Sequence, residues 1–238
     1  MQSDFLSPVS GYRGDTGLSS YMARIYAYMT GGLALTGITA WLTAHSYTLM
    51  HMLYTMQGDV ITGMSMIGWL VMLAPLGLVF MMSFGMGSLS APAMHGAFWL
   101  YAALAGLSLS VIFLGYTDAS IAEACFVTAG MFGGMSFYGH ATKRDLSGMG
   151  SFMLAGLVGL IIASLVNLFL RSAGMQFGLS ILGVLIFAGL TAYDTQKLKD
   201  LYLEGDNENA AIAGALTLYL DVINIFIDLL MMAGKKRS

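Results

Sequence analysis

Long apolar runs, separated by short polar or glycine-rich connections, dominate the pattern of hydrophobic and polar positions along this chain. No Asp, Glu, Lys or Arg occurs between Asp59 and Asp118, and this stretch is interrupted by the glycine- and serine-rich segment 85–92. Because a bilayer-spanning helix needs about 20 mostly apolar residues, the stretch predicts two helices rather than one. The same pattern along the whole chain predicts seven spans, near residues 26–46, 64–84, 93–114, 120–138, 151–170, 177–196 and 210–234.

Composition supports a membrane protein. Hydrophobic residues make up 57% of the chain and charged residues only 10%, which excludes an ordinary soluble domain and predicts an all-α polytopic membrane protein whose main partner is the lipid bilayer. The net charge is −3 and the basic residues stand in short clusters, so no surface that follows nucleic acid phosphates is expected. Nucleic acid is therefore not predicted as a partner.

Polar stretches bound the predicted membrane domain. Residues 1–20 contain a proline and three glycines and lack the apolar core of a cleaved signal peptide, so a disordered polar tail is expected there. The seven-helix domain is predicted over residues 21–234 and a basic tail over 235–238.

The basic residues of short loops predict the orientation. If the chain crosses seven times, six basic residues lie on the side of the N-terminus and four lie on the opposite side, which favours a cytoplasmic N-terminus. The first group is Arg13, Arg24, Lys143, Arg144, Lys197 and Lys199, and the second is Arg171, Lys235, Lys236 and Arg237. If the last segment did not cross, the C-terminal tail would join the first group, and the count would be nine against one.

Carboxylates interrupt the last two predicted spans. Asp194 ends a long uncharged run, and Asp221 and Asp228 lie in the final span with Thr217 and Asn224 at spacings that place all four on one helix face. An Asp inside a bilayer helix costs about 2.5–3.5 kcal/mol, so such acids tend to be buried, paired and functional. If Asp194 and Asp221 meet, they cannot both ionise cheaply, so a shared proton would make a pH-sensitive latch. For Thr217 and Asn224, structural hydrogen bonding is the equal alternative to lining a pore.

Several strings resemble the Bax inhibitor-1 (TMBIM) family, most closely its bacterial branch. They are AYDTQKLK at 192–199, LYLDVINIF at 218–226, TAGMFGGMSFYG at 128–139 and TKRDLSGMGSF at 142–152. The resemblance implies a multi-pass protein of the bacterial inner membrane, folded as a seven-helix bundle with the last helix central. It also implies a pH-sensitive passive calcium leak, in which Asp194 and Asp221 match a di-aspartate pH sensor. It carries no role over to Asp228, and the basic gating residue of some bacterial members is absent from span 64–84.

Calcium prefers six to eight oxygen ligands. Deprotonated Asp194, Asp221 and Asp228, with Asn224, Thr217 and water, offer such oxygens, so a calcium contact is predicted at Asp194 and Asp221. No resident cofactor is expected.

Two other functions remain open at this stage. One is a non-conducting regulator that binds membrane proteases or stress-response proteins, as some bacterial relatives are thought to do. The other is an intramembrane aspartyl hydrolase, in which paired carboxylates activate water. The sequence Leu-Tyr-Leu-Asp at 218–221 lacks the glycines of the GxGD motif of those proteases, so no enzymatic activity is expected. The single cysteine, Cys125, is interpreted as a small core residue.

Overall fold

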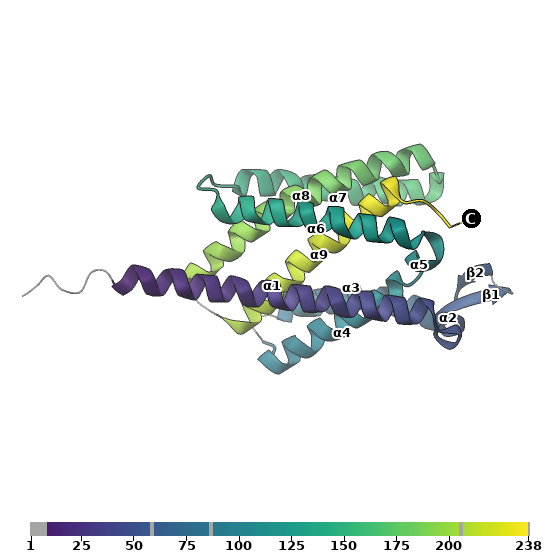
Figure 1. Ribbon diagram of the computed structural model, residues 1–238, viewed down its shortest axis with the longest axis horizontal. Helices are drawn as coiled ribbons and strands as arrows, with labels where there is room; N and C mark the ends of the chain where they lie inside the picture. The colour runs from purple at the N-terminus through teal and green to yellow at the C-terminus, as the bar shows by residue number, and fades with distance from the viewer. Residues whose placement is uncertain (1–8, 58–59, 86–87, 205–206, 238) are drawn as a thin grey trace, which may run out of the picture.

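The computed structural model of the chain describes residues 9–57, 60–85, 88–204 and 207–237 (Figure 1). Within these ranges the protein is a helical bundle with one small β-hairpin, so the predicted all-α membrane fold is confirmed. The elements are α1 (Val9–Ala44), α2 (Tyr47–Leu53), β1 (Tyr54–Gln57), β2 (Val60–Met64), α3 (Met66–Gly85), α4 (Ala91–Leu109), α5 (Ile112–Gly115), α6 (Asp118–Ala141), α7 (Ser147–Leu170), α8 (Ala173–Glu204) and α9 (Glu208–Ala233).

Six spans within the described residues are long and apolar enough to cross a membrane: α3, α4 together with α5, α6, α7, α8 and α9. α1 has 36 residues but is not among them, because threonines, tyrosines and glycines such as Tyr26, Thr30 and Gly31 interrupt its apolar positions. α1 nevertheless packs along α4 and α9, and its start lies at the opposite end of the bundle from the C-terminus (Figure 1). The count of seven crossings stays a prediction.

α9 runs between two groups of helices. α1, α3 and α4 lie on one side of it and α6, α7 and α8 on the other (Figure 1). It contacts α1, α4, α6 and α8, while α3 and α7 pack mainly against α4 and α8. Its buried residues include Leu218, Tyr219, Ile225 and Leu230. The last helix is therefore central, and α1, α4, α6 and α8 supply most of its contacts.

Two glycines let helices approach backbone to backbone. A Cβ atom at Gly139 of α6 would collide with the carbonyl oxygen of Ala192 on α8. A Cβ atom at Gly106 of α4 would lie 2.5 Å from the carbonyl oxygen of Thr36 on α1. Small residues at such positions permit the close packing on which helix association in a membrane depends.

The N-terminal helix begins earlier than the sequence predicts. α1 starts at Val9, so residues 9–20 are helical where a disordered tail is expected, and residues 1–8 lie outside the described residues. The helix is supported beyond the predicted boundary because Leu18 packs against the hydrophobic core, and an added Cβ atom at Gly17 would collide with the Tyr202 hydroxyl of α8. This partner comes from a helix distant in sequence, so periodicity could not reveal it.

The connection after α1 is also more ordered than predicted. The sequence predicts a polar loop, whereas the structure has α2 followed by an antiparallel pairing of β1 with β2, in which Tyr54 faces Met64. β-Branched and aromatic residues favour paired strands, and Val60, Ile61 and Thr62 provide them here.

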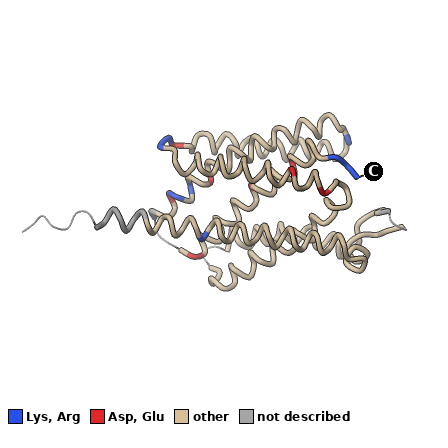
Figure 2. Tube along the Cα trace, in the orientation of Figure 1, with Lys and Arg blue, Asp and Glu red and all other residues tan. Residues whose placement is uncertain are grey.

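The basic C-terminal segment packs on the start of α6. The Lys235 amide donates to the Ser120 hydroxyl (2.9 Å), and the Arg237 amide donates to the carbonyl of Gly115 (3.0 Å). Residues 235–237 are thus held by the protein, and Ser238 lies outside the described residues. Figure 2 shows that Lys and Arg gather at the two ends of the bundle, as expected where helices leave a bilayer.

Candidate acidic site between α8 and α9

The structure brings Asp194 and Asp221 together across the contact between α8 and α9. Asp221 is only 4% exposed, and Asp194 is half-buried. The two carboxylates lie close enough for their charges to interact, and the Thr191 hydroxyl lies near Asp221. The juxtaposition arises because a short turn joins α8 to α9, and Asp194 lies ten residues before the end of α8 while Asp221 lies thirteen residues after the start of α9, roughly 15 and 20 Å along each axis.

One carboxylate oxygen of Asp221, Oδ2, is buried without a hydrogen-bond partner among the described residues. The Thr191 hydroxyl, which lies near Asp221, donates to the carbonyl of Phe187 at 2.8 Å. A buried carboxylate without a partner is costly, and a proton or a cation on this oxygen would reduce the cost. Packing alone does not account for an acid at this place.

Asp228 does not join the pair. It lies two helical turns beyond Asp221, roughly 10 Å along the axis. Its carboxylate rests against Gly183 of α8, where a Cβ atom would collide with it. Asp228 therefore contacts α8 at Gly183, away from the contact between Asp194 and Asp221.

The two polar residues of the same face bond within their own helix. The Thr217 hydroxyl donates to the carbonyl of Ala213 (3.1 Å), and the Asn224 amide donates to the carbonyl of Leu220 (2.8 Å). Both side chains are half-buried. Their positions agree with the structural alternative considered from the sequence, and nothing in these contacts directs them toward Asp221.

A resident calcium cage is not assembled. The described part of the chain contains no group of three or more His, Cys, Asp or Glu side chains placed to hold a metal ion. Asp194, Asp221 and Asp228 therefore do not form such a group, and the calcium contact at Asp194 and Asp221 stays a prediction. Two carboxylates supply at most four oxygens, whereas calcium takes six to eight, so Asp194 and Asp221 fit a passing, partly hydrated ion better than a permanent one.

A chain of hydroxyl groups next to this site escaped the sequence analysis. The Tyr26 hydroxyl of α1 bonds to the Ser136 hydroxyl of α6 (2.7 Å), which bonds to the Thr195 hydroxyl of α8 (3.0 Å). Thr195 is fully buried and adjoins Asp194 in sequence. These residues come from three helices, so only the fold shows that they meet.

Comparison with known proteins identifies the family. The family model described as inhibitor of apoptosis-promoting Bax1 matches residues 18–238, which include α1 from Leu18 onward and every later helix. The chain belongs to the Bax inhibitor-1 family. The resemblance seen in the sequence is thereby confirmed.

Several bacterial proteins match this chain over almost their whole length. The inner membrane protein YbhL of Escherichia coli K12 is 46% identical over 227 residues, which cover 93% of this chain and 94% of YbhL. The uncharacterized protein RP147 of Rickettsia prowazekii is 43% identical over 228 residues, covering 94% of this chain and 93% of the relative. An uncharacterized protein of Borreliella burgdorferi is 40% identical over 225 residues, covering 92% and 94%.

Proposed function

We propose that this Bax inhibitor-1 family protein is a pH-sensitive passive cation pathway of the bacterial inner membrane, with calcium as its ion and Asp194 and Asp221 as its latch. The observation that carries the proposal is the burial of Asp221 beside Asp194, with one carboxylate oxygen unpaired among the described residues. The inner membrane is proposed because YbhL bears that location in its name.

The latch would act through the number of protons on the pair. One shared proton lets the carboxyl of one helix donate to the carboxylate of the other, which ties α8 to α9. Full ionisation places two negative charges in a poorly solvated contact, so they repel, and full protonation removes the charge-assisted bond. Either change weakens the tie between the helices and alters the access of a cation to the carboxylate oxygens.

The surrounding helices support this assignment. α9 is central and α8 is its neighbour, so a change at their contact reaches α1, α4 and α6. In the orientation we propose, the N-terminus is cytoplasmic, and the turn between α8 and α9 faces the same side. The proton count of the pair would then respond to the pH of the cytoplasm.

Reconstitution tests the proposal. Purified protein in calcium-loaded liposomes should release calcium faster than protein-free liposomes, and the rate should change with pH. Release equal to that of protein-free liposomes at every pH would refute the proposal. The same samples, incubated with a peptide substrate, test the hydrolase alternative, for which we expect no cleavage. Capture of a membrane protease by protein that releases no calcium would favour a regulator.

A further inference from the structure

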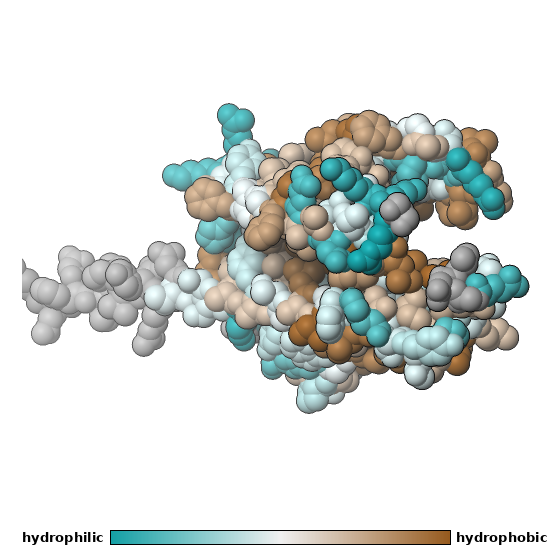
Figure 3. All heavy atoms as spheres, turned by 45° about the vertical axis from the view of Figure 1, so that its right-hand side comes forward, coloured by the Kyte–Doolittle hydropathy of each residue, from teal (hydrophilic) through white to brown (hydrophobic). Residues whose placement is uncertain are grey.

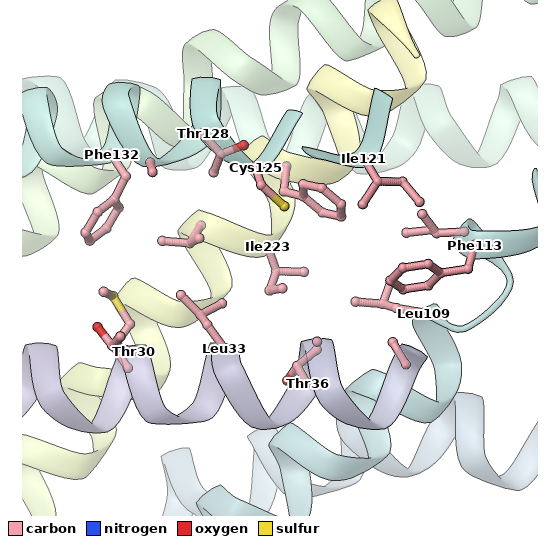
Figure 4. A pocket seen from close by; sticks show the side chains of 17 residues that line it. Thr30, Leu33, Thr36, Leu109, Phe113, Ile121, Cys125, Thr128, Phe132 and Ile223 are labelled. Atoms are coloured by element: carbon pink, nitrogen blue, oxygen red, sulfur yellow. The ribbon is translucent and has the colours of Figure 1, made fainter. Parts of the chain in front are cut away.

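A cavity of about 400 Å³ lies beside α9, between α1 and α6 (Figure 4). Leu33 and Thr36 of α1, Thr128 of α6 and Ile223 of α9 line its walls, and Phe113 of α5 lies at one end. Hydrophobic side chains line the hollow between the two halves of the bundle on the face seen in Figure 3. This cavity is separate from the acidic site, since neither Asp194 nor Asp221 lines it.

The chemistry of the lining excludes a route for cations. No Asp, Glu, Lys, Arg or His side chain lines the cavity, and its polar groups are threonine hydroxyls and the thiol of Cys125. The Thr128 hydroxyl is buried and has no hydrogen-bond partner among the described residues. The walls therefore suit a hydrocarbon rather than a hydrated ion.

The cavity opens sideways between two helices. Thr30 and Gly37 of α1 and Cys125 and Ala129 of α6, which line it, are exposed. Cys125, expected from the sequence to be a core residue, is thus an exposed residue of the opening, and its sulfur points between α1 and α6 (Figure 4). In a bilayer this opening faces acyl chains.

A second cavity, of about 740 Å³, continues along the same seam between α1 and α6. Phe132 lines both cavities, and the second is also lined by Tyr26, Ser136 and His140. The Lys199 ammonium donates to the carbonyl of His140 at 3.1 Å. Lys143 and Arg144 stand two and three residues beyond the end of α6, so basic residues follow the polar end of the seam.

The length of the seam matches one leaflet. Thr128 lies roughly 18 Å along the helix axis from His140, at 1.5 Å per residue. Half of a hydrocarbon core of roughly 30 Å is of similar depth. A lipid with its headgroup at the basic end therefore places the end of an acyl chain in the apolar cavity.

We propose that one phospholipid with an anionic headgroup binds in the seam between α1 and α6, with an acyl chain in the apolar cavity and its phosphate near Lys143, Arg144 and Lys199. A hydrocarbon chain supplies the contacts that the walls of an unfilled void lack. Basic side chains at the membrane boundary attract anionic headgroups. The proposal does not rest on the proposed calcium pathway.

Native mass spectrometry tests the site directly. Full-length protein in detergent is given equal amounts of dioleoyl phosphatidylglycerol and dioleoyl phosphatidylcholine, and one phosphatidylglycerol per chain should be retained in preference. Gly37→Leu fills the opening and should lower retention about tenfold, because a leucine displaces about ten atomic contacts of about 0.1–0.2 kcal/mol each. Gly159→Leu is the matched control, since both glycines are exposed helical residues with open space around an added Cβ atom. Should Gly37→Leu fail to fold, Ala129→Leu replaces it.

Alkylation gives a second readout, because Cys125 is the only cysteine of the chain. Phosphatidylglycerol should slow the reaction of Cys125 with N-ethylmaleimide in the wild type. The double variant Lys143→Gln/Arg144→Gln should retain less phosphatidylglycerol but unchanged phosphatidylcholine. Equal retention by Gly37→Leu and Gly159→Leu, or alkylation that phosphatidylglycerol does not slow, would overturn the proposal. Protection that instead rises with protein concentration would assign the seam to a second copy of the chain.

Discussion

Removing one partner of the hydrogen bond between Thr36 and Tyr219 should destabilise the bundle unequally. The Thr36 hydroxyl lies 2.8 Å from the Ala102 carbonyl and 2.9 Å from the Gly32 carbonyl, and 2.7 Å from the Tyr219 hydroxyl. A carbonyl can only accept, so Thr36 donates to a carbonyl and Tyr219 donates to Thr36. The Tyr219 side chain is fully buried, and its hydroxyl therefore depends on this one acceptor.

These roles set the size of each effect. Tyr219→Phe removes a donor but leaves Thr36 bonded to a carbonyl, so it should cost about 0.6 kcal/mol of the free energy of unfolding, the average for hydrogen bonds between membrane helices. Thr36→Val leaves the buried Tyr219 hydroxyl without its acceptor, so it should cost about 1–3 kcal/mol. The double variant leaves no orphaned hydroxyl, and its cost should fall below the sum of the two by about 1 kcal/mol.

Unfolding by sodium dodecyl sulfate in mixed micelles, followed by tryptophan fluorescence, measures the three free energies. The reasoning would be refuted by a Tyr219→Phe variant that is less stable than Thr36→Val. Costs that simply add in the double variant would also contradict it, because additivity means that the two hydroxyls do not interact.

Two further predictions concern α6 and the turn that follows it. Gly139→Ala should destabilise the protein by about 1–3 kcal/mol in the same assay, because the added Cβ atom meets the Ala192 carbonyl. The control Gly130→Ala has open space around the added Cβ atom and should be neutral or stabilising. Equal effects of the two variants would contradict the close approach of α6 to α8. Hydrogen bonds from the Ser147 side chain and amide hold the pKa of Asp145 below its usual value of 3.8. Because the folded pKa is the lower one, the stabilisation of the turn is present above the unfolded pKa and is lost as pH falls through the folded pKa. Protection of the Ser147 amide from hydrogen exchange should decrease over that range in the wild type and not in Asp145→Asn, and unchanged wild-type protection would refute the role.

Much of the helical plan follows from the distribution of charge. Uncharged runs of about 20 residues are required by a bilayer, so the spans from 64 onward could be located from sequence. The meeting of Asp194 with Asp221 could also be anticipated, because α8 and α9 are consecutive helices and the two residues lie at similar distances from the turn that joins them. Local spacing was sufficient for these features.

Features that depend on which helix faces meet could not be anticipated. The contact of Asp228 with Gly183 of α8 is such a feature, because helical spacing places Asp228 on the same face as Asp221 and does not show what that face meets two turns further along. Cys125 lies in an apolar segment, as a core residue would, yet it is exposed at the opening beside α1. Lipid-facing and protein-facing positions carry the same apolar residues, so composition does not distinguish them.

The pH profile of calcium release tests the central role of Asp194 and Asp221 most directly. Liposomes containing wild type, Asp194→Asn, Asp221→Asn or the control Glu123→Gln, an exposed acid on α6, are compared from about pH 5 to pH 8. We predict that release by the wild type and by Glu123→Gln changes with pH in the same way, and that each Asn variant alters this dependence. Wild-type release that is flat over this range, or Asn variants that keep the wild-type profile, would contradict the account.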